Sequence, residues 1–76
     1  MGAGMARRHT PLRQYVDARL GGMADVPAIS QALGVTRQHV HAMLVDRHPS
    51  LRLAIRLYRW SGDDELLRPE RWEPWA

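Results

Sequence analysis

Five hydrogen-bonding side chains follow a glycine in the stretch ISQALGVTRQHVHAML, residues 29 to 44: Thr36, Arg37, Gln38, His39 and His41. Thr36, Arg37, Gln38 and His41 lie close together in a segment whose apolar residues have helical spacing. An arginine can donate two hydrogen bonds to the O6 and N7 atoms of guanine, and a glutamine can pair in the same way with the N6 and N7 atoms of adenine. The cluster therefore offers the chemistry of base recognition, and a threonine at a helix start can also contact a phosphate.

The residues around this cluster predict two short helices that meet at Gly34. Glycine adopts the left-handed backbone conformation that a tight corner between helices uses. The side chains that would hold the two helices together are apolar or small: Ile29, Ser30, Leu33, Val35, Val40 and Met43. The residues that this leaves available for contact with another molecule are Thr36, Arg37, Gln38, His41 and Ala42. The pattern leaves two interpretations open, a DNA-reading helix-turn-helix and a simple corner between helices with a solvated polar face.

Helix-start and helix-stop signals recur along the chain, and the sequence predicts no strand. Thr10 before Pro11 predicts a capped helix start, and Gly21 with Gly22 predicts the end of that helix. Three further caps are expected at polar residues: Asp25, Thr36 and Ser50. The predicted helices lie at about 11–20, 26–33, 36–45 and 51–60, with a helical turn at 63–67. The expected fold class is all-α, a compact bundle of four to five short helices.

Apolar residues at helical spacing predict which face of each helix is buried. The expected inward-facing residues are Leu12, Tyr15, Val16, Leu20, Ile29, Ala32, Leu33, Val40, Met43 and Leu44. His39 lies beside this face and is therefore expected to make no base contact. The helix at 51–60 is apolar around more than one face, so part of it is expected to meet a second subunit. Trp60 and Trp72 are expected in the core, and Trp75 at the surface or in a dimer contact.

Charge is unevenly distributed along the 76 residues. Residues 1–60 hold nine arginines and three acidic residues, whereas residues 61–76 hold two arginines and five acidic residues. A basic body with an acidic tail suggests a polyanionic partner. The expected organisation is a flexible basic N-terminal arm at 1–9 and a single domain at 10–76 that ends in a short acidic tail.

Other kinds of chemistry find little support in the sequence. There is no cysteine, and His39 and His41 are two residues apart on a helix, so they point in different directions and cannot chelate one metal ion. Asp63, Asp64 and Glu65 open a helical turn, where acids complement the helix dipole, and no nucleophile–base pair accompanies them. We therefore expect no enzyme, no cofactor and no metal site. No apolar run approaches the roughly 18 residues of a membrane span.

The stretch ISQALGVTRQHVHAML resembles the helix-turn-helix of the phage Cro and repressor superfamily. The downstream stretch LRLAIRLYRWSGDDELLRPERWEP resembles one branch of it, the Cro-like proteins also called YdaS-like antitoxins. In that branch the helix-turn-helix is followed by a basic turn, a helix that contains Ala-Ile, and a closing Leu-Arg-Pro-acid-x-Trp segment. In this chain the closing segment is Leu67 to Trp72. The likeness covers about residues 11–74. Ser30 and Met43 stand where the family more often has alanine and tryptophan, and they keep a small and an apolar residue there.

The resemblance implies a lambda-repressor-like fold and a sequence-specific repressor of phage or prophage type that binds a double-stranded DNA operator. The base readers that the resemblance implies are Arg37, Gln38 and His41, and the phosphate contacts that it implies are Thr36 and Arg47. From the residues themselves we add Ala42 to the base-reading set, and we expect further contacts to the DNA backbone from His48, Arg13 and Arg52. We expect a homodimer, formed in solution or only on DNA, in the cytoplasm of a bacterial host and at the nucleoid when bound. The alternative is an antitoxin or adaptor that binds a partner protein.

Overall fold

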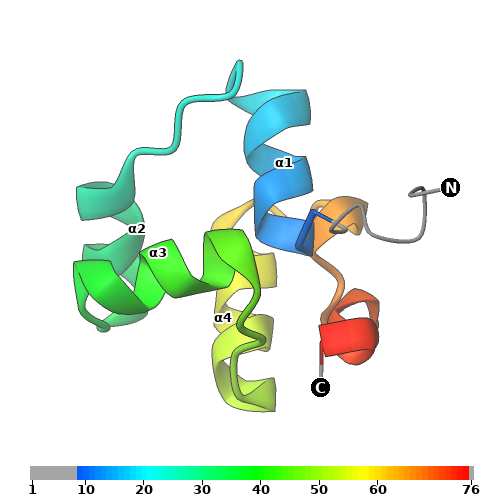
Figure 1. Cartoon of the computed structure of the whole chain (residues 1–76). Helices are drawn as coiled ribbons and strands as arrows, with labels where there is room; N and C mark the ends of the chain where they lie inside the picture. Colours follow the sequence, from blue (N-terminus) through cyan, green and yellow to red (C-terminus); the bar gives the residue numbers. More distant parts are fainter. Residues whose placement is uncertain (1–8, 76) are drawn as a thin grey trace, which may run out of the picture.

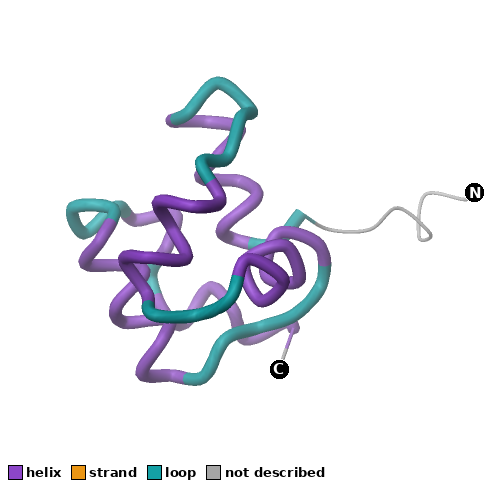
Figure 2. The backbone as a smooth tube through the Cα atoms, turned by 90° about the vertical axis from the view of Figure 1, so that its left-hand side faces the viewer, coloured by secondary structure: helices purple, strands orange, loops and turns teal. Residues whose placement is uncertain are grey.

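The computed structural model describes residues 9–75, so the predicted basic arm, apart from His9, lies outside the described residues. The described part contains four α-helices, two short 3₁₀ helices and no strand, joined by loops (Figures 1 and 2). The helices are α1 Pro11–Arg19, α2 Val26–Leu33, α3 Arg37–Val45, α4 Leu51–Trp60, η2 Glu65–Leu67 and η3 Pro69–Trp75. The predicted all-α class is confirmed, and each α-helix begins and ends within one residue of its predicted bounds.

Each α-helix begins at a polar side chain that accepts a hydrogen bond from a backbone N–H three residues further on. The caps, with their N···O distances, are Thr10 (3.2 Å), Asp25 (3.1 Å), Thr36 (3.1 Å) and Ser50 (3.3 Å). Such a cap satisfies one of the backbone donors that a helix start leaves without an intrahelical partner, and it contributes about 1 kcal/mol. All four predicted caps are confirmed.

The corner between α2 and α3 depends on the backbone conformation of Gly34. Its φ angle is +69°, in the left-handed region that side-chain-bearing residues rarely adopt. The Ser30 carbonyl oxygen accepts hydrogen bonds from the N–H groups of both Gly34 (2.9 Å) and Val35 (3.1 Å), which closes the last turn of α2. A Cβ atom at Gly34 would meet no atom of residues 9–75 within 4 Å. The glycine is therefore required by the turn itself and not by a close approach of the two helices.

The core is an apolar cluster to which each described helix contributes. Its buried members are Leu12, Tyr15, Val16, Ile29, Leu33, Val40, Met43, Leu53, Ala54, Leu57, Leu67 and Trp72. In this cluster α3 packs against α1 and α2, while α4 packs against α2 and both 3₁₀ helices. Helix α3 therefore has the core on one side only, and Figure 1 shows it at the edge of the bundle beside α2.

Two predicted core positions are wrong. Leu20 is 37% exposed because α1 ends at Arg19, so that Leu20 lies beyond the last helical residue. Ala32 is exposed because the buried stripe of α2 is narrow. At about 100° per residue, Leu33 and Ser30 lie on one side of Ile29 and Ala32 lies on the other. Ser30, only 9% exposed, takes the place in the core that the apolar pattern assigned to alanine.

The C-terminal tail folds back onto the helices. Trp72 is buried, as predicted, and Trp75 is half-buried with its ring centroid 6.4 Å from that of Trp72 in an edge-on arrangement. Trp60 is half-buried against the core, with its ring 5.9 Å from that of Tyr15. An ion pair between Arg19 and Asp64 joins the start of the tail to the end of α1.

Candidate nucleic-acid interface

One face of α3 is buried and the opposite face is open. Val40 and Met43 are fully buried on the inner face. The outer face carries the four residues predicted to read bases: Arg37, Gln38, His41 and Ala42. The first three are exposed and Ala42 is half-buried. At about 100° per residue these positions span less than half of the helix circumference, so the structure brings the predicted base readers together on one surface.

The polar groups of this outer face are not used by the fold. Within residues 9–75, the side chains of Arg37, Gln38 and His41 make no hydrogen bond or ion pair with the protein. The exposed Thr36 hydroxyl accepts a hydrogen bond from the His39 N–H at 3.1 Å, and a hydroxyl that accepts can still donate. The donors and acceptors of this face are therefore available to another molecule.

The C-terminal end of α3 is held by a hydrogen bond from α1. The buried Thr10 hydroxyl donates to the Met43 carbonyl oxygen at 2.6 Å. That carbonyl lies in the last turn of α3, where carbonyls have no intrahelical donor. The Arg47 N–H donates to the Ala42 carbonyl oxygen at 2.9 Å and not to the Met43 carbonyl oxygen. Thr10 therefore caps α1 and fixes the end of α3 with the same hydroxyl.

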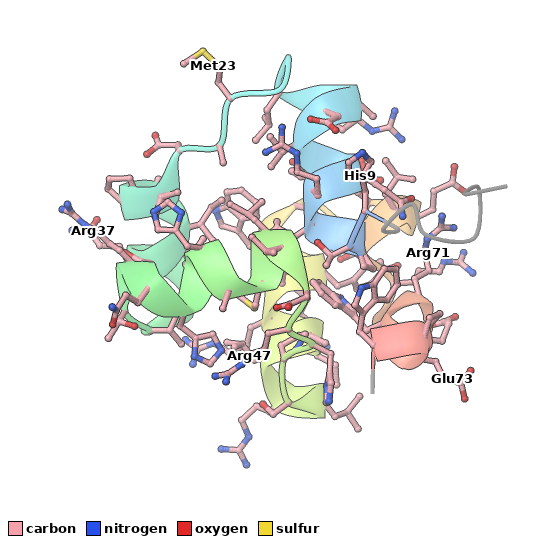
Figure 3. The ribbon with its side chains drawn as sticks, in the orientation of Figure 1. His9, Met23, Arg37, Arg47, Arg71 and Glu73 are labelled. Carbon is pink, nitrogen blue, oxygen red and sulfur yellow. The ribbon has the colours of Figure 1, made fainter. Side chains whose placement is uncertain are left out.

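A basic turn follows the C-terminal end of α3. Arg47 is exposed, and no acidic side chain in the described range pairs with it. The His48 ring is turned toward its own chain, with Nδ1 2.9 Å from the Pro49 carbonyl oxygen. A depression at this turn is lined by His39, Asp46, Arg47, His48, Ser50 and Trp75. Figure 3 shows Arg37 and Arg47 toward opposite ends of α3, so a positive charge stands near each end of the helix.

The other two arginines predicted to contact the DNA backbone lie on different helices. On α1, the guanidinium of Arg13 is 3.2 Å from the Asp17 carboxylate, and both side chains are partly exposed. An exposed pair of this kind contributes only about 0–1 kcal/mol, but it compensates much of the charge that Arg13 would offer to a phosphate. Arg52 is exposed on α4 and makes no ion pair with a described residue. Arg52 is thus the stronger candidate of the two.

Two further residues of α3 complete the description of its faces. His39 is half-buried beside the inner face, and its Nε2 atom is enclosed without a hydrogen-bond partner among the described residues. Val45 is 53% exposed and lies four residues after His41, on the outer face. Sequence reasoning missed Val45, although the four-residue spacing was a signal that could have found it.

The acidic tail is tied to the end of α1. The Arg19 Nε–H donates to Asp64 Oδ2 at 2.8 Å, and Asp64 also accepts from the Leu66 N–H at 2.9 Å. These hydrogen bonds hold the pKa of the Asp64 carboxyl below its usual range, and the same pair raises the pKa of the Arg19 guanidinium. Figure 3 shows Glu73 of the tail on the opposite side of the molecule from Arg37. The Glu73 carboxylate therefore does not neutralise the charge of Arg37.

Comparisons with known proteins found no relative of this chain. No protein-family model, curated protein or solved structure matches the sequence or its fold. Among residues 9–75, no helix is both long enough and apolar enough to cross a membrane. In the same range, no three histidine, cysteine or acidic side chains gather closely enough to hold a metal ion.

Proposed function

We propose that this chain is a sequence-specific regulator of transcription that binds double-stranded DNA, a Cro-like repressor of phage or prophage type. In this proposal α2 and α3 act as a helix-turn-helix, and α3 enters the major groove. The observation that carries the proposal is the outer face of α3. Arg37, Gln38 and His41 are exposed there and form no hydrogen bond or ion pair with residues 9–75, on a helix whose inner face is buried in the core.

The dimensions of α3 suit the major groove. An α-helix with its side chains is about 10–12 Å across, which fits the major groove of about 12 Å width, and the nine residues of α3 make it about 13.5 Å long. Recognition helices place their N-terminal residues against the base edges. Arg37 and Gln38 lie in the first turn of α3, and each well-aligned bidentate pair with a base is worth about 1–3 kcal/mol of discrimination. We assign base reading to these two residues first and to His41, one turn further on, second.

Contacts to the DNA backbone are assigned to groups at the two ends of α3. The Thr36 hydroxyl and the N-terminus of α3 favour an anion at one end. Arg47 and His48 flank the other end, and Arg52 lies on the neighbouring α4. Each arginine that neutralises a phosphate releases a counterion, so the affinity should fall steeply with added salt. As a homodimer on a palindromic operator, the protein would read half-sites about 34–36 Å apart.

The direct test begins with selection of a preferred duplex from random sequences, followed by fluorescence anisotropy at several salt concentrations. We expect Arg37→Ala to lose discrimination at one base pair by about fivefold to a hundredfold. Arg47→Ala should weaken binding to all duplexes alike and lower the salt slope by about one. Arg71→Ala is the matched control, because Figure 3 places Arg71 on the far side from Arg37.

Two results would contradict the assignment. If the wild-type chain binds no duplex in a salt-dependent way, DNA is not its partner. If the wild-type chain binds but Arg37→Ala leaves both the affinity and the base preference unchanged, α3 does not read the bases in the orientation proposed.

A second candidate function is a protein-interaction module of the antitoxin or adaptor type. It is favoured by the exposed apolar side chains of Leu51 and Ile55 on α4, which a partner protein would cover. A stable complex with one partner protein, formed by a chain that binds no duplex alone, would support this candidate. Because an antitoxin can also repress its own operon, binding to both DNA and a protein would join the two functions.

A further inference from the structure

The outer face of α4 carries two large apolar side chains that are open to solvent. Leu51 is 69% exposed, and Ile55, one turn further along, is 38% exposed. The helix does not need either residue to join the core, because Leu53, Ala54 and Leu57 already bury its inner face. We call the pair Leu51 and Ile55 the α4 strip. Contiguous exposed apolar surface of this kind commonly marks an interaction site.

Opposite charges border the two sides of the α4 strip. On one side the same helix carries two exposed arginines besides Arg52, the proposed DNA contact: Arg56 and Arg59. On the other side a groove separates the strip from η3, and its lining includes Ala54, Trp72, Glu70 and Glu73. At about 100° per residue, Ala54 lies on the opposite side of Leu51 from the arginines. The surface therefore runs from a basic edge, across the strip, to an acidic edge.

We propose that a second copy of this chain docks on the α4 strip, with the α4 helices of the two copies parallel. In a two-fold dimer the same patch meets itself. When the two-fold axis runs parallel to α4, the two helices are parallel, and the basic side of one strip lies against the acidic side of the other. The basic edge of each copy therefore faces the acidic edge of its partner. An axis across α4 would set arginines against arginines and glutamates against glutamates. Charge complementarity therefore selects a second copy in the parallel arrangement.

The strength of this contact follows from its size. An interface centred on two aliphatic side chains belongs to the weak class, which buries less than about 1,200 Å². The monomer and dimer should therefore exchange, with a balance that depends on concentration. This inference deepens the proposed repressor function, because two half-sites call for two copies, but the pairing itself is measured without DNA.

The first experiment is sedimentation equilibrium of the full chain, without DNA, from micromolar to millimolar concentrations. We expect a concentration-dependent dimer. Leu51→Ser should raise its dissociation constant by about tenfold or more, because both copies lose a leucine from the contact. Met23→Ser is the matched control, since it removes an apolar side chain that is 81% exposed in the loop between α1 and α2, away from the strip.

Clear outcomes would overturn the pairing. A wild-type chain that stays monomeric at all concentrations would leave the strip to a different protein. Equal weakening by Leu51→Ser and Met23→Ser would remove the strip as the cause. Either result leaves the proposed DNA binding standing if the monomer still binds duplex DNA, so failure of this inference is distinguishable from failure of the proposed function.

The alignment of the two copies is tested with single cysteines, because the natural chain has none. Under mild oxidation, Leu51→Cys should form disulfide-linked dimers much faster than Met23→Cys. The reason is that an axis along α4 brings equivalent positions of the strip within disulfide range. In an antiparallel pair, Leu51 of one copy would face Ile55 of the other. Rapid cross-linking only in a mixture of Leu51→Cys and Ile55→Cys would therefore overturn the parallel arrangement.

Discussion

The Thr10 hydroxyl joins α1 to α3, and replacing threonine by valine removes that hydroxyl at nearly constant shape. Two interactions are lost in Thr10→Val. One is the cap bond from the Arg13 N–H, with an N···O distance of 3.2 Å, and the other is the 2.6 Å hydrogen bond to the Met43 carbonyl oxygen. Thr10 is fully buried, so water cannot replace either interaction without rearrangement of the surrounding side chains.

The expected loss of stability can be worked from these two contacts. A missing hydroxyl cap costs about 0.5–2 kcal/mol. A buried carbonyl left without a donor costs about 1–3 kcal/mol. Together they predict a fall of about 1.5–5 kcal/mol in the free energy of unfolding, a large part of the roughly 5–15 kcal/mol of a typical domain. At about 4–8 °C per kcal/mol for a domain of this size, Tm should fall by at least about 6 °C.

The assay is thermal and urea denaturation followed by circular dichroism. Thr10→Ser is the control, because serine keeps the hydroxyl and loses only a methyl group, so most of the stability should remain. If Thr10→Val unfolds at the wild-type temperature, the two hydrogen bonds do not stabilise the fold as argued. If Thr10→Ser loses as much as Thr10→Val, packing of the methyl group is the cause and the hydroxyl is not.

Two further predictions concern the corner and the tail. Gly34→Ala should lower the free energy of unfolding by about 1–2 kcal/mol in urea titrations, because φ is +69° and no atom of the described residues crowds the new Cβ. Gly34→Asn should lose less, because asparagine tolerates a left-handed backbone better than alanine does. Equal losses in the two variants would contradict a backbone cause. The ion pair with Arg19 lowers the pKa of Asp64, so its stabilisation is complete above about pH 4 and is lost as the pH falls further. In Arg19→Gln, Tm should therefore fall less steeply than in the wild-type chain as the pH is lowered below about 4. If Tm depends on pH in the same way in both proteins, this ion pair does not contribute to the acid loss of stability.

Signals that act within a few residues were sufficient to predict the four α-helices. A cap is a contact between residues three apart, and a left-handed glycine ends a helix by its own backbone angle. Thr36 and Gly34 therefore carried the same information in the sequence as in the structure. The exposed position of Arg37 also followed from local spacing, because a helix whose other face is apolar must turn its polar face outward.

Contacts between distant residues were beyond the reach of such signals. The Thr10 hydroxyl meets a carbonyl 33 residues away, and Arg19 meets Asp64 45 residues away. Neither contact has a periodic pattern, since each depends on how the helices cross. Ala32 was placed wrongly for a related reason: apolar spacing gives the direction of a buried face, but the neighbouring helices decide its width.

Folding and proposed binding use different residues of the same nine-residue helix. The outer side chains of α3, such as Arg37 and Gln38, contact no described side chain through a hydrogen bond or ion pair, and alanine is the best helix former. Their replacement by alanine should therefore lower DNA affinity while Tm stays constant or rises slightly. Thr10→Val, in contrast, removes the bond that holds the end of α3, and it should lower Tm and affinity together. A loss of affinity at constant Tm thus identifies a direct contact to DNA, and a change of base preference separates a base contact from a phosphate contact, whereas a joint loss of Tm and affinity identifies the support of the helix.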